Sequence, residues 1–363
     1  MDVAELHGIA IVGGGICGLA TALALYRKGI TSIVLERAET LRTTGAGIGM
    51  QSNGWRALDQ LGVGLKLRQT AIPVLRNGEA RCLKRSILVE TLANELPTGT
   101  IRFGCQIIDV QMDPLTSLPI LQLHDGTVIK AKVAIGCDGV NSVIANFIGL
   151  KPPKQSTMGG ARGFTNCENG HGFSLELVTI NKGHVLLGRF PLDHNLVYWF
   201  VARPITPQDT TKIISLALES VKGFPREMLE MIQNCDVDSL TFNGIRYRVP
   251  WELLNARFRK GTVTVAGDAM HVMGPFLGQG GSIALEDAIV LARCLATQRR
   301  AEVALDQYIG ERRMRLVQIS TKTYVVGTLL ETLSVVVKLL CIVLMVIFFC
   351  ERLGHTRYDC GDL

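Results

Sequence analysis

Three glycines near the start of the chain have the spacing of a phosphate-binding turn. Gly13, Gly15 and Gly18 form a G-x-G-x-x-G pattern. In such a pattern the first glycine permits a tight turn, the second lets backbone approach a pyrophosphate, and the third lets a helix pack closely. Glu36 lies 18 residues past Gly18, where a carboxylate can accept both hydroxyls of an adenosine ribose and would repel a 2′-phosphate. This spacing predicts a dinucleotide site, for FAD or for NAD.

Two later stretches place an acid directly after a buried strand. Asp138 and Gly139 follow the run VAIGC, and Asp268 follows VTVAG. Beyond Asp268 come Pro275 and a glycine-rich helix start, which can present backbone N–H groups to a carbonyl or a phosphate. An NAD enzyme needs only the first fingerprint, whereas the longer FAD molecule can use both ends. We therefore expect the turns near residues 13, 138 and 268 to converge on one flavin nucleotide.

Positioning these residues requires a strand–helix–strand unit at the start of the chain. Residues 8–12 and 33–35 are predicted to be buried strands, and helical spacing of apolar residues from Ile16 to Ala24 predicts the connecting helix. Two later segments, 183–192 and 195–205, are rich in branched and aromatic residues and predict further strands.

Alternation along the second of these strands puts Tyr198 and Phe200 on one face and Trp199 on the other. One face could cover a flavin ring and bind a planar, apolar substrate. The aromatic side chains could equally form the core of a sheet, and the sequence leaves both readings open.

These motifs together resemble the flavin-dependent aromatic-hydroxylase-type monooxygenases, in particular plant proteins allied to salicylate hydroxylase-like and zeaxanthin epoxidase-like proteins. The resemblance runs from about Gly8 to Arg293. It implies an α/β fold in which a doubly wound, Rossmann-like FAD-binding domain carries an inserted β-sheet substrate domain. The apolar run near the C-terminus predicts an additional hydrophobic helix. The expected bounds are 1–72, 84–155 and 244–322 for the FAD-binding domain, 156–243 for the substrate domain, and 323–363 for the hydrophobic helix and a polar tail.

The resemblance also implies roles for single residues. Glu36 would hold the adenosine ribose, Asp268 the ribityl chain, and Arg85 would open a helix that contacts FAD. Asp138 would lie near the pyrophosphate and the approach of NAD(P)H. The expected cofactor-binding residues are Gly13, Gly15, Gly18, Glu36, Arg37, Arg85, Asp138, Gly139, Asp268, Pro275, Gly278, Gln279, Gly280 and Gly281. Tyr198, Phe200 and Arg162 are the expected substrate-pocket residues, and neither a catalytic residue nor a metal site is assigned.

The implied reaction is a monooxygenation. NADH or NADPH would reduce the flavin, O2 would add at its C4a position, and the hydroperoxide would hydroxylate or epoxidise a small aromatic or apolar substrate. Because this chemistry belongs to the cofactor, His271 is interpreted as a residue that shapes the flavin pocket. Glu286 and Asp287 are interpreted as residues that interact with a helix dipole or cap the helix. An FAD-linked oxidase or dehydrogenase, or a catalytically weakened FAD-binding protein, stays open as an alternative.

Three departures from the family pattern favour the weakened alternative. No basic residue follows Ser142 at the family's usual place, and Val272 follows His271 where the family usually has proline. The region 68–84 is also shorter than the family norm, which could open one side of the pocket or leave a sheet edge unpaired.

Composition narrows the partners and the location. The formal charge of +6 is mild and the basic residues form no long runs, so a nucleic-acid partner is not expected. Ten cysteines without a CxxC, and no secretory signal, predict reduced thiols in the cytoplasm. The expected partners are a small organic substrate and O2. Oligomeric state stays open.

The C-terminal region contains an uncharged run over residues 339–350. Twelve residues are short of the roughly 20 that a membrane span needs. The run is therefore interpreted as a packed core helix, as a helix lying on a bilayer, or as a tail anchor at the cytosolic face of a membrane.

Overall fold

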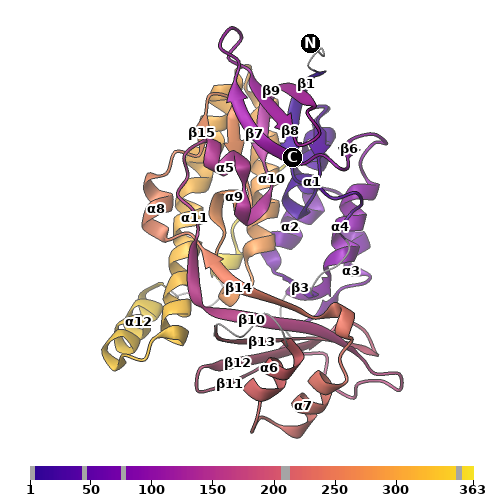
Figure 1. The fold of residues 1–363 in the computed structure, drawn as a ribbon, viewed down its shortest axis with the longest axis vertical. Helices are drawn as coiled ribbons and strands as arrows, with labels where there is room; N and C mark the ends of the chain where they lie inside the picture. Colours follow the sequence, from indigo (N-terminus) through magenta and orange to yellow (C-terminus); the bar gives the residue numbers. More distant parts are fainter. Residues whose placement is uncertain (1–4, 43–46, 75–78, 206–212, 349–353) are drawn as a thin grey trace.

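The computed structural model describes residues 5–42, 47–74, 79–205, 213–348 and 354–363. The molecule has two β-sheet regions, a large mixed sheet with helices around it and a five-stranded antiparallel sheet beside it (Figure 1). A small third sheet of three strands lies between positions 47 and 84 of the chain.

The large sheet confirms the predicted α/β class. Its strand order is β15-β16-β9-β1-β2-β6, and β8 joins β9 while β7 pairs with β8. β1 pairs in parallel with both β2 and β9, and β16 pairs in parallel with β9. The strands are β1 (Glu5–Val12), β2 (Ile33–Leu35), β6 (Ile101–Arg102), β7 (Ile107–Met112), β8 (Pro119–Leu123), β9 (Val128–Gly136), β15 (Arg259–Lys260) and β16 (Val263–Val265).

Helices pack against this sheet and bury most of the apolar side chains. α1 (Ile16–Arg27) follows β1 as the helical spacing predicts, and it packs against α10 (Gly280–Thr297). Both helices are buried over most of their length. The shorter helices of this region are α2 (Ser52–Gln60), α3 (Gly64–Arg68), α4 (Arg85–Asn94), α5 (Val143–Phe147), α8 (Pro250–Asn255) and α9 (Asp268–His271).

The five-stranded sheet contains both strands predicted in the middle of the chain. Its order is β11-β12-β13-β10-β14, and two helices cover its outer face (Figure 1). Trp199 is fully buried in the core beneath these helices, whereas Tyr198 packs in a separate cluster with Phe190. The elements are β10 (Lys154–Asn166), β11 (Val178–Lys182), β12 (Val185–Pro191), β13 (Leu196–Pro204), β14 (Thr241–Tyr247), α6 (Ile213–Ser220) and α7 (Arg226–Gln233).

The short region 68–84 contributes to the third sheet. Its strands are β3 (Gly47–Met50), β4 (Ile72–Pro73) and β5 (Arg81–Lys84), in the order β3-β5-β4. β5 lies in the middle and pairs antiparallel with both neighbours.

The C-terminal region differs from the expectation. α11 (Ala301–Glu331) runs without a break past residue 323, and α12 (Val335–Phe348) follows it and projects from the body (Figure 1). The expectation that α12 is a packed core helix is wrong, because Cys341 is its one buried side chain among those described. About half of its circumference, at 3.6 residues a turn, is exposed and wholly apolar: Val335, Val336, Leu339, Leu340, Ile342, Val343, Val346 and Ile347.

The last ten residues return to the body of the protein. Arg56 Nη1 donates to the carbonyl oxygens of Arg357 and Tyr358 at 2.6 and 3.2 Å, and Leu363 N donates to Gln60 Oε1 at 3.0 Å. Within the described ranges, no helix is both long enough and apolar enough to cross a bilayer. The tail-anchor interpretation therefore has no support here, while residues 349 and 350 of the apolar run lie outside the described residues.

Candidate dinucleotide site

Three turns meet at one edge of the large sheet. Val12 and Val265 are both register partners of Gly136, because β1 and β16 flank β9 on its two sides. The ladders continue just past the strand ends, where Cys137 N donates to Val12 O at 2.8 Å and Ala266 N donates to Gly136 O at 2.9 Å. The turns near residues 13, 138 and 268 consequently lie side by side.

Two of the three glycines in the first turn, Gly13 and Gly18, occupy positions that no larger residue fits. Gly13 has φ +105°, and a Cβ there would lie 2.5 Å from the carbonyl oxygen of Cys137. A Cβ on Gly18 would overlap the carbonyl oxygen of Gly13. A Cβ on Gly15, by contrast, would meet no atom of the described residues within 4 Å. Since Gly15 is the N-cap of α1 and no side chain caps that helix, the first N–H groups of α1 face open space suited to a phosphate.

Glu36 lies beside this turn at the end of β2. Its Oε2 accepts a hydrogen bond from Gly14 N at 2.6 Å, and its Oε1 accepts one from Ala38 N at 2.9 Å. These bonds hold the carboxylate over the glycine turn, although Glu36 itself is only 7% exposed. Arg37, also an expected cofactor residue, is exposed.

Two acids stand at the other two turns. Asp138 Oδ2 accepts from Val143 N at 2.8 Å, while its Oδ1 is buried without a hydrogen-bond partner among the described residues. Burial raises the pKa of Asp138. Asp268 is accessible to solvent, yet surrounding protein desolvates it enough to raise the pKa of its carboxyl group. An unsatisfied buried oxygen and a desolvated but accessible carboxylate both suit hydroxyl or N–H donors from a ligand.

The helix start after Asp268 is held by residues that the motifs did not reveal. Gln279 is buried, and its Nε2 donates to Gln51 Oε1 at 2.7 Å while its Oε1 accepts from Asn53 Nδ2 at 2.9 Å. Gln51 Nε2 also donates to Leu277 O at 2.7 Å. Gln51 directly precedes α2, and Asn53 lies in the first turn of that helix. In the sequence, the only sign of this network is that polar residues follow a strand.

The rest of this stretch lies beside the network. Pro275 is exposed and begins the 3-10 turn η3 (Pro275–Leu277), and Gly278 follows it with φ +60°. A Cβ on Gly280 would meet nothing within 4 Å, and α10 also lacks a side-chain cap. A Cβ on Gly281 would crowd Ile48 at 2.8 Å, and Gly139 adopts φ +78° in the second turn.

Arg85 lies within electrostatic reach of both these turns and the five-stranded sheet. Burial lowers the pKa of Arg85, the nearby Arg162 and Arg42 lower it further, and Glu36 and Asp268 act against them. Arg162 lies on β10, and its Nε donates to Thr241 Oγ1 at 2.9 Å. Tyr198 and Phe200 face the same side of the sheet, with ring centroids 6.3 Å apart.

A buried ion network lies behind the third turn, which corrects the interpretation of Glu286 and Asp287. Neither caps α10 or lies in its first turn. Asp287 Oδ2 accepts from Gly267 N at 2.9 Å and lies 2.6 Å from His271 Nε2, while its Oδ1 accepts from Arg312 Nε at 2.7 Å. Arg315 Nη2 donates to Glu286 Oε1 at 2.8 Å. These acids therefore brace α9 and α10 against α11. Nothing in the sequence of α11 indicated that its arginines pair with these acids.

The family comparison agrees with this geometry. Residues 7–94 and 84–323 match the family described as FAD binding domain. Monooxygenase 1 of Arabidopsis thaliana is 48% identical over an alignment of 396 residues, covering 99% of this chain and 100% of that protein. Monooxygenase 2 of the same plant is 36% identical over 362 residues, with 88% of each chain covered.

Solved structures share the fold at lower identity. The substrate complex of salicylate hydroxylase has a TM-score of 0.77 at 20% identity, covering 99% of this chain and 97% of that one. Klebsiella pneumoniae HpxO, complexed with FAD and uric acid, has a TM-score of 0.81 at 20% identity, covering 96% of each chain.

Proposed function

The chain belongs to the FAD binding domain family as an FAD-dependent monooxygenase of the aromatic-hydroxylase type, and from this premise we propose that it uses NADH or NADPH and O2 to hydroxylate or epoxidise a small aromatic or apolar organic compound. The observation that supports this most is the juxtaposition of the three turns around Gly15, Asp138 and Asp268.

The residues at these turns suit the two ends of FAD. We assign Glu36 and Arg37 to the adenosine ribose, the N–H groups at Gly15 to the pyrophosphate, and Asp268 to the ribityl chain. Asp138 stands between them, and its Oδ1 has no hydrogen-bond partner in the described part of the chain, which suits a hydroxyl or N–H donor. When bound, FAD supplies electron transfer and oxygen activation.

Substrate binding and the exclusion of water are assigned to the five-stranded sheet. We assign residues 156–243 as the substrate domain and place Arg162, Tyr198 and Phe200 at the substrate. Tyr198 is 6% exposed and packs against Phe190 at 4.8 Å between ring centroids, so this face can exclude water from the reacting atoms. Arg162 can orient a polar group, since its guanidinium keeps donors beyond the one that Thr241 accepts.

Replacing Gly15 with Val tests the cofactor site. The described protein atoms leave room for the first carbon of the side chain, so the variant should fold but lose FAD, because the side chain occupies the space of the pyrophosphate. Flavin absorbance per mole of purified protein measures the loss, and circular dichroism checks the fold. Gly310→Ala is the control, since a Cβ there also meets nothing within 4 Å. A Gly15→Val variant with full flavin content would contradict the assignment.

The same protein decides among the alternative reactions. NADPH-driven O2 consumption with an oxygenated product identified by mass is the expected result. Hydrogen peroxide as the sole product would favour the oxidase alternative. A flavin-loaded protein that consumes neither NADH nor NADPH with any aromatic compound tried would favour the weakened FAD-binding protein.

Contact of α12 with a bilayer surface stays a prediction, and it is independent of the cofactor and substrate assignments. Its exposed apolar half-circumference is the feature that favours it. Flotation of the full chain with vesicles of mixed neutral and anionic lipid, compared with Leu339→Glu, tests it; equal flotation of the two proteins would contradict it.

A further inference from the structure

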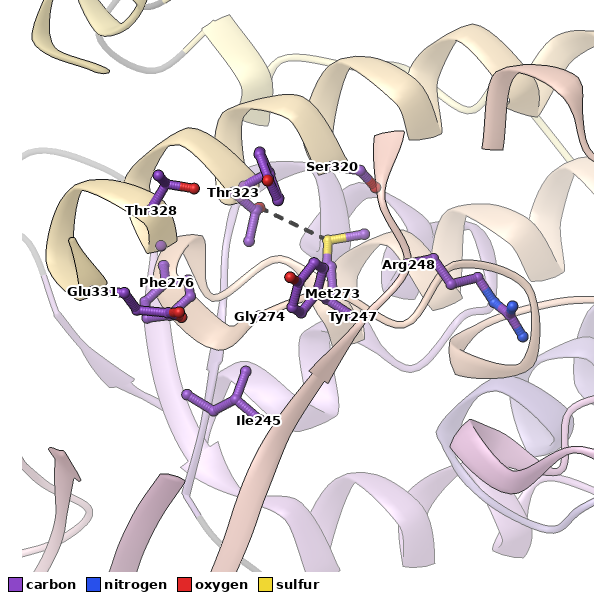
Figure 2. A pocket seen from close by; sticks show the side chains of 12 residues that line it. Ile245, Tyr247, Arg248, Met273, Gly274, Phe276, Ser320, Thr323, Thr328 and Glu331 are labelled. Carbon is purple, nitrogen blue, oxygen red and sulfur yellow. Dashed lines mark hydrogen bonds between the residues drawn. The ribbon is translucent and has the colours of Figure 1, made fainter. Parts of the chain in front are cut away.

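A pocket lies between α11, β14 and the loop that leads into η3 (Figure 2). Its empty space is about 390 Å³, a figure that includes open solvent at its mouth. Six of its lining residues carry hydroxyl or carboxylate groups, and we call it the hydroxyl pocket after them: Tyr247, Ser320, Thr323, Tyr324, Thr328 and Glu331.

One hydroxyl of this pocket is buried and unsatisfied. Ser320 is 2% exposed, and its Oγ has no hydrogen-bond partner among the residues that the structure describes. Buried polar atoms without partners are uncommon in folded proteins and call for an explanation. A ligand with a polar group at this end of the pocket would supply the missing partner.

The charge of the pocket favours a hydrogen-bond donor over an anion. Glu331 is its one acidic lining residue, and it accepts hydrogen bonds from Ser156 at 2.6 Å and Thr157 at 3.1 Å. The guanidinium of Arg248 points away from the other labelled side chains (Figure 2) and donates to Ala269 O at 3.3 Å and to Lys151 O. Arg248 also lines the pocket, and its buried Nε has no hydrogen-bond partner among the described residues. A carboxylate ligand would meet the negative charge of Glu331, while the outer nitrogens of Arg248 already donate to backbone carbonyls.

Aromatic rings form one wall of the pocket. The Tyr247 and Tyr324 ring centroids are 5.8 Å apart with planes inclined at 50°, a tilted arrangement that leaves ring edges and faces available to another aromatic group. Met273 adds a polarizable apolar surface. The walls thus suit a planar, apolar ring system.

Phe276 separates this pocket from a second one. Its ring fits between Gly274 and Gly327, where a Cβ on either glycine would lie 2.6 Å from the ring. The second pocket is also lined by Phe276, together with Met158, Leu186 and Ala202 of the five-stranded sheet. Ala202 lies two residues beyond Phe200 on β13, so it shares the sheet face of the expected substrate residues.

We propose that Phe276 divides a single substrate site into two compartments and that the hydroxyl pocket receives the hydrogen-bonding end of a planar, apolar substrate. The substrate class is an extended aromatic compound with a hydroxyl or amino group at one end. The reacting ring occupies the compartment over the sheet. This inference rests on the proposed function, because Pro275 and Gly278, which flank Phe276, are assigned to the flavin.

Calorimetric titration of the purified full chain with 2-naphthol and 2-naphthoate tests the pocket. We expect 2-naphthol to bind at least tenfold more tightly than 2-naphthoate. Ser320→Ala should weaken 2-naphthol about fivefold, the effect of one net hydrogen bond. Wild-type protein that binds neither probe, or that prefers 2-naphthoate, would overturn the proposal.

Two glycines of α11 test the partition. Gly327→Ala should displace the Phe276 ring and change 2-naphthol affinity at least fivefold, because the added Cβ collides with the ring. Gly310→Ala in the same helix meets nothing within 4 Å and should leave the affinity unchanged. If the two variants bind 2-naphthol equally, Phe276 is not held as the partition.

Phe276→Ala supplies a second variant in case Gly327→Ala fails to fold. Removing the ring joins the compartments, so 4-phenylphenol should gain at least fivefold in affinity relative to 2-naphthol. An unchanged ratio would contradict the partition. Flavin content, read by absorbance in the same samples, separates the two proposals: FAD-loaded protein without probe binding refutes the hydroxyl pocket alone, whereas probe binding without any flavin refutes the cofactor assignment.

Discussion

At the scale of single residues, Arg312 is the most consequential charge in the molecule. It is fully buried, and burial by itself would lower the pKa of its guanidinium. Glu286 and Asp287 overcome that effect and hold the pKa well above its usual range. The three groups form a buried network in which each charge needs the others.

Arg312→Met should therefore be strongly destabilising. It leaves two buried carboxylates without their shared partner, and breaking a buried pair in this way costs about 3–5 kcal/mol. Urea unfolding measures the change. Arg313→Met is the matched control, because Arg313 is half-buried and donates to the backbone carbonyls of Leu253 and Leu254 instead of to acids. Equal stability of the two variants would show that the network contributes little.

At the scale of elements, the C-terminal segment 354–363 contains a pH-sensitive contact. Burial, with the nearby Lys322 and Arg315, lowers the pKa of His355 to about 4. A histidine in the unfolded chain titrates near about 6.5. Between these pH values the unfolded chain binds more protons than the folded one, so the folded state loses stability as the pH falls from about 6.5 to about 4.

His355→Gln should flatten this dependence. The free energy of unfolding, measured by urea at pH values from 4 to 7, should fall less steeply on acidification in the variant than in the wild type. His124→Gln, at an exposed position of the loop after β8, should follow the wild-type curve. A His355→Gln curve parallel to the wild type would contradict the assignment.

The two faces of α12 give a prediction about the same region. Leu339 is 59% exposed, whereas Leu344 is only partly exposed on the side of the helix that includes buried Cys341. Leu339→Gln should change the free energy of unfolding by no more than about 0.5 kcal/mol, as surface substitutions do. Leu344→Gln should cost more, because it removes apolar contact. Thermal unfolding of both variants compares them, and a larger loss for Leu339→Gln would mean that the described orientation of α12 is wrong.

The elements show which local signals suffice. β1, α1 and β2 follow from apolar spacing and glycines within 30 residues, and β12 and β13 follow from runs of branched and aromatic residues. Of the readings of α12, the packed core helix was wrong. An apolar helix usually becomes buried, but the sequence does not show which neighbours are available to cover it. The docking of residues 354–363 depends on Arg56 and Arg315, both distant along the chain.

At the scale of the whole molecule, the proposed cofactor site could be predicted from local sequence patterns, whereas the hydroxyl pocket could not. The convergence of turns near 13, 138 and 268 was predictable, because carboxyl ends of parallel strands share one edge of a sheet. The hydroxyl pocket combines β14, the loop before η3 and the second half of α11. No motif links those segments, and the glycines that admit Phe276 are recognisable only once α11 lies against the loop.

Since the proposed cofactor site joins segments between residues 13 and 281, FAD should stabilise the fold as a unit. A ligand that binds only the folded state adds about 2.7 kcal/mol at one hundred times its Kd. We expect the midpoint of thermal unfolding to rise with FAD concentration in deflavinated wild-type protein. Gly15→Val should show no such rise, because its site is obstructed while its strands are intact.

Comparing deflavinated and FAD-loaded wild-type protein also distinguishes FAD binding at the three turns from the folding of those turns. If FAD were required to bring the three turns together, apo protein would lose secondary structure along with flavin. The backbone bonds between Cys137 and Val12 and between Ala266 and Gly136 join the turns directly through protein groups, so deflavinated protein should keep its far-ultraviolet circular dichroism and rebind FAD. Apo protein that unfolds at 25 °C would show that the convergence depends on the cofactor. A midpoint independent of FAD in the wild type would show that these turns do not form its site.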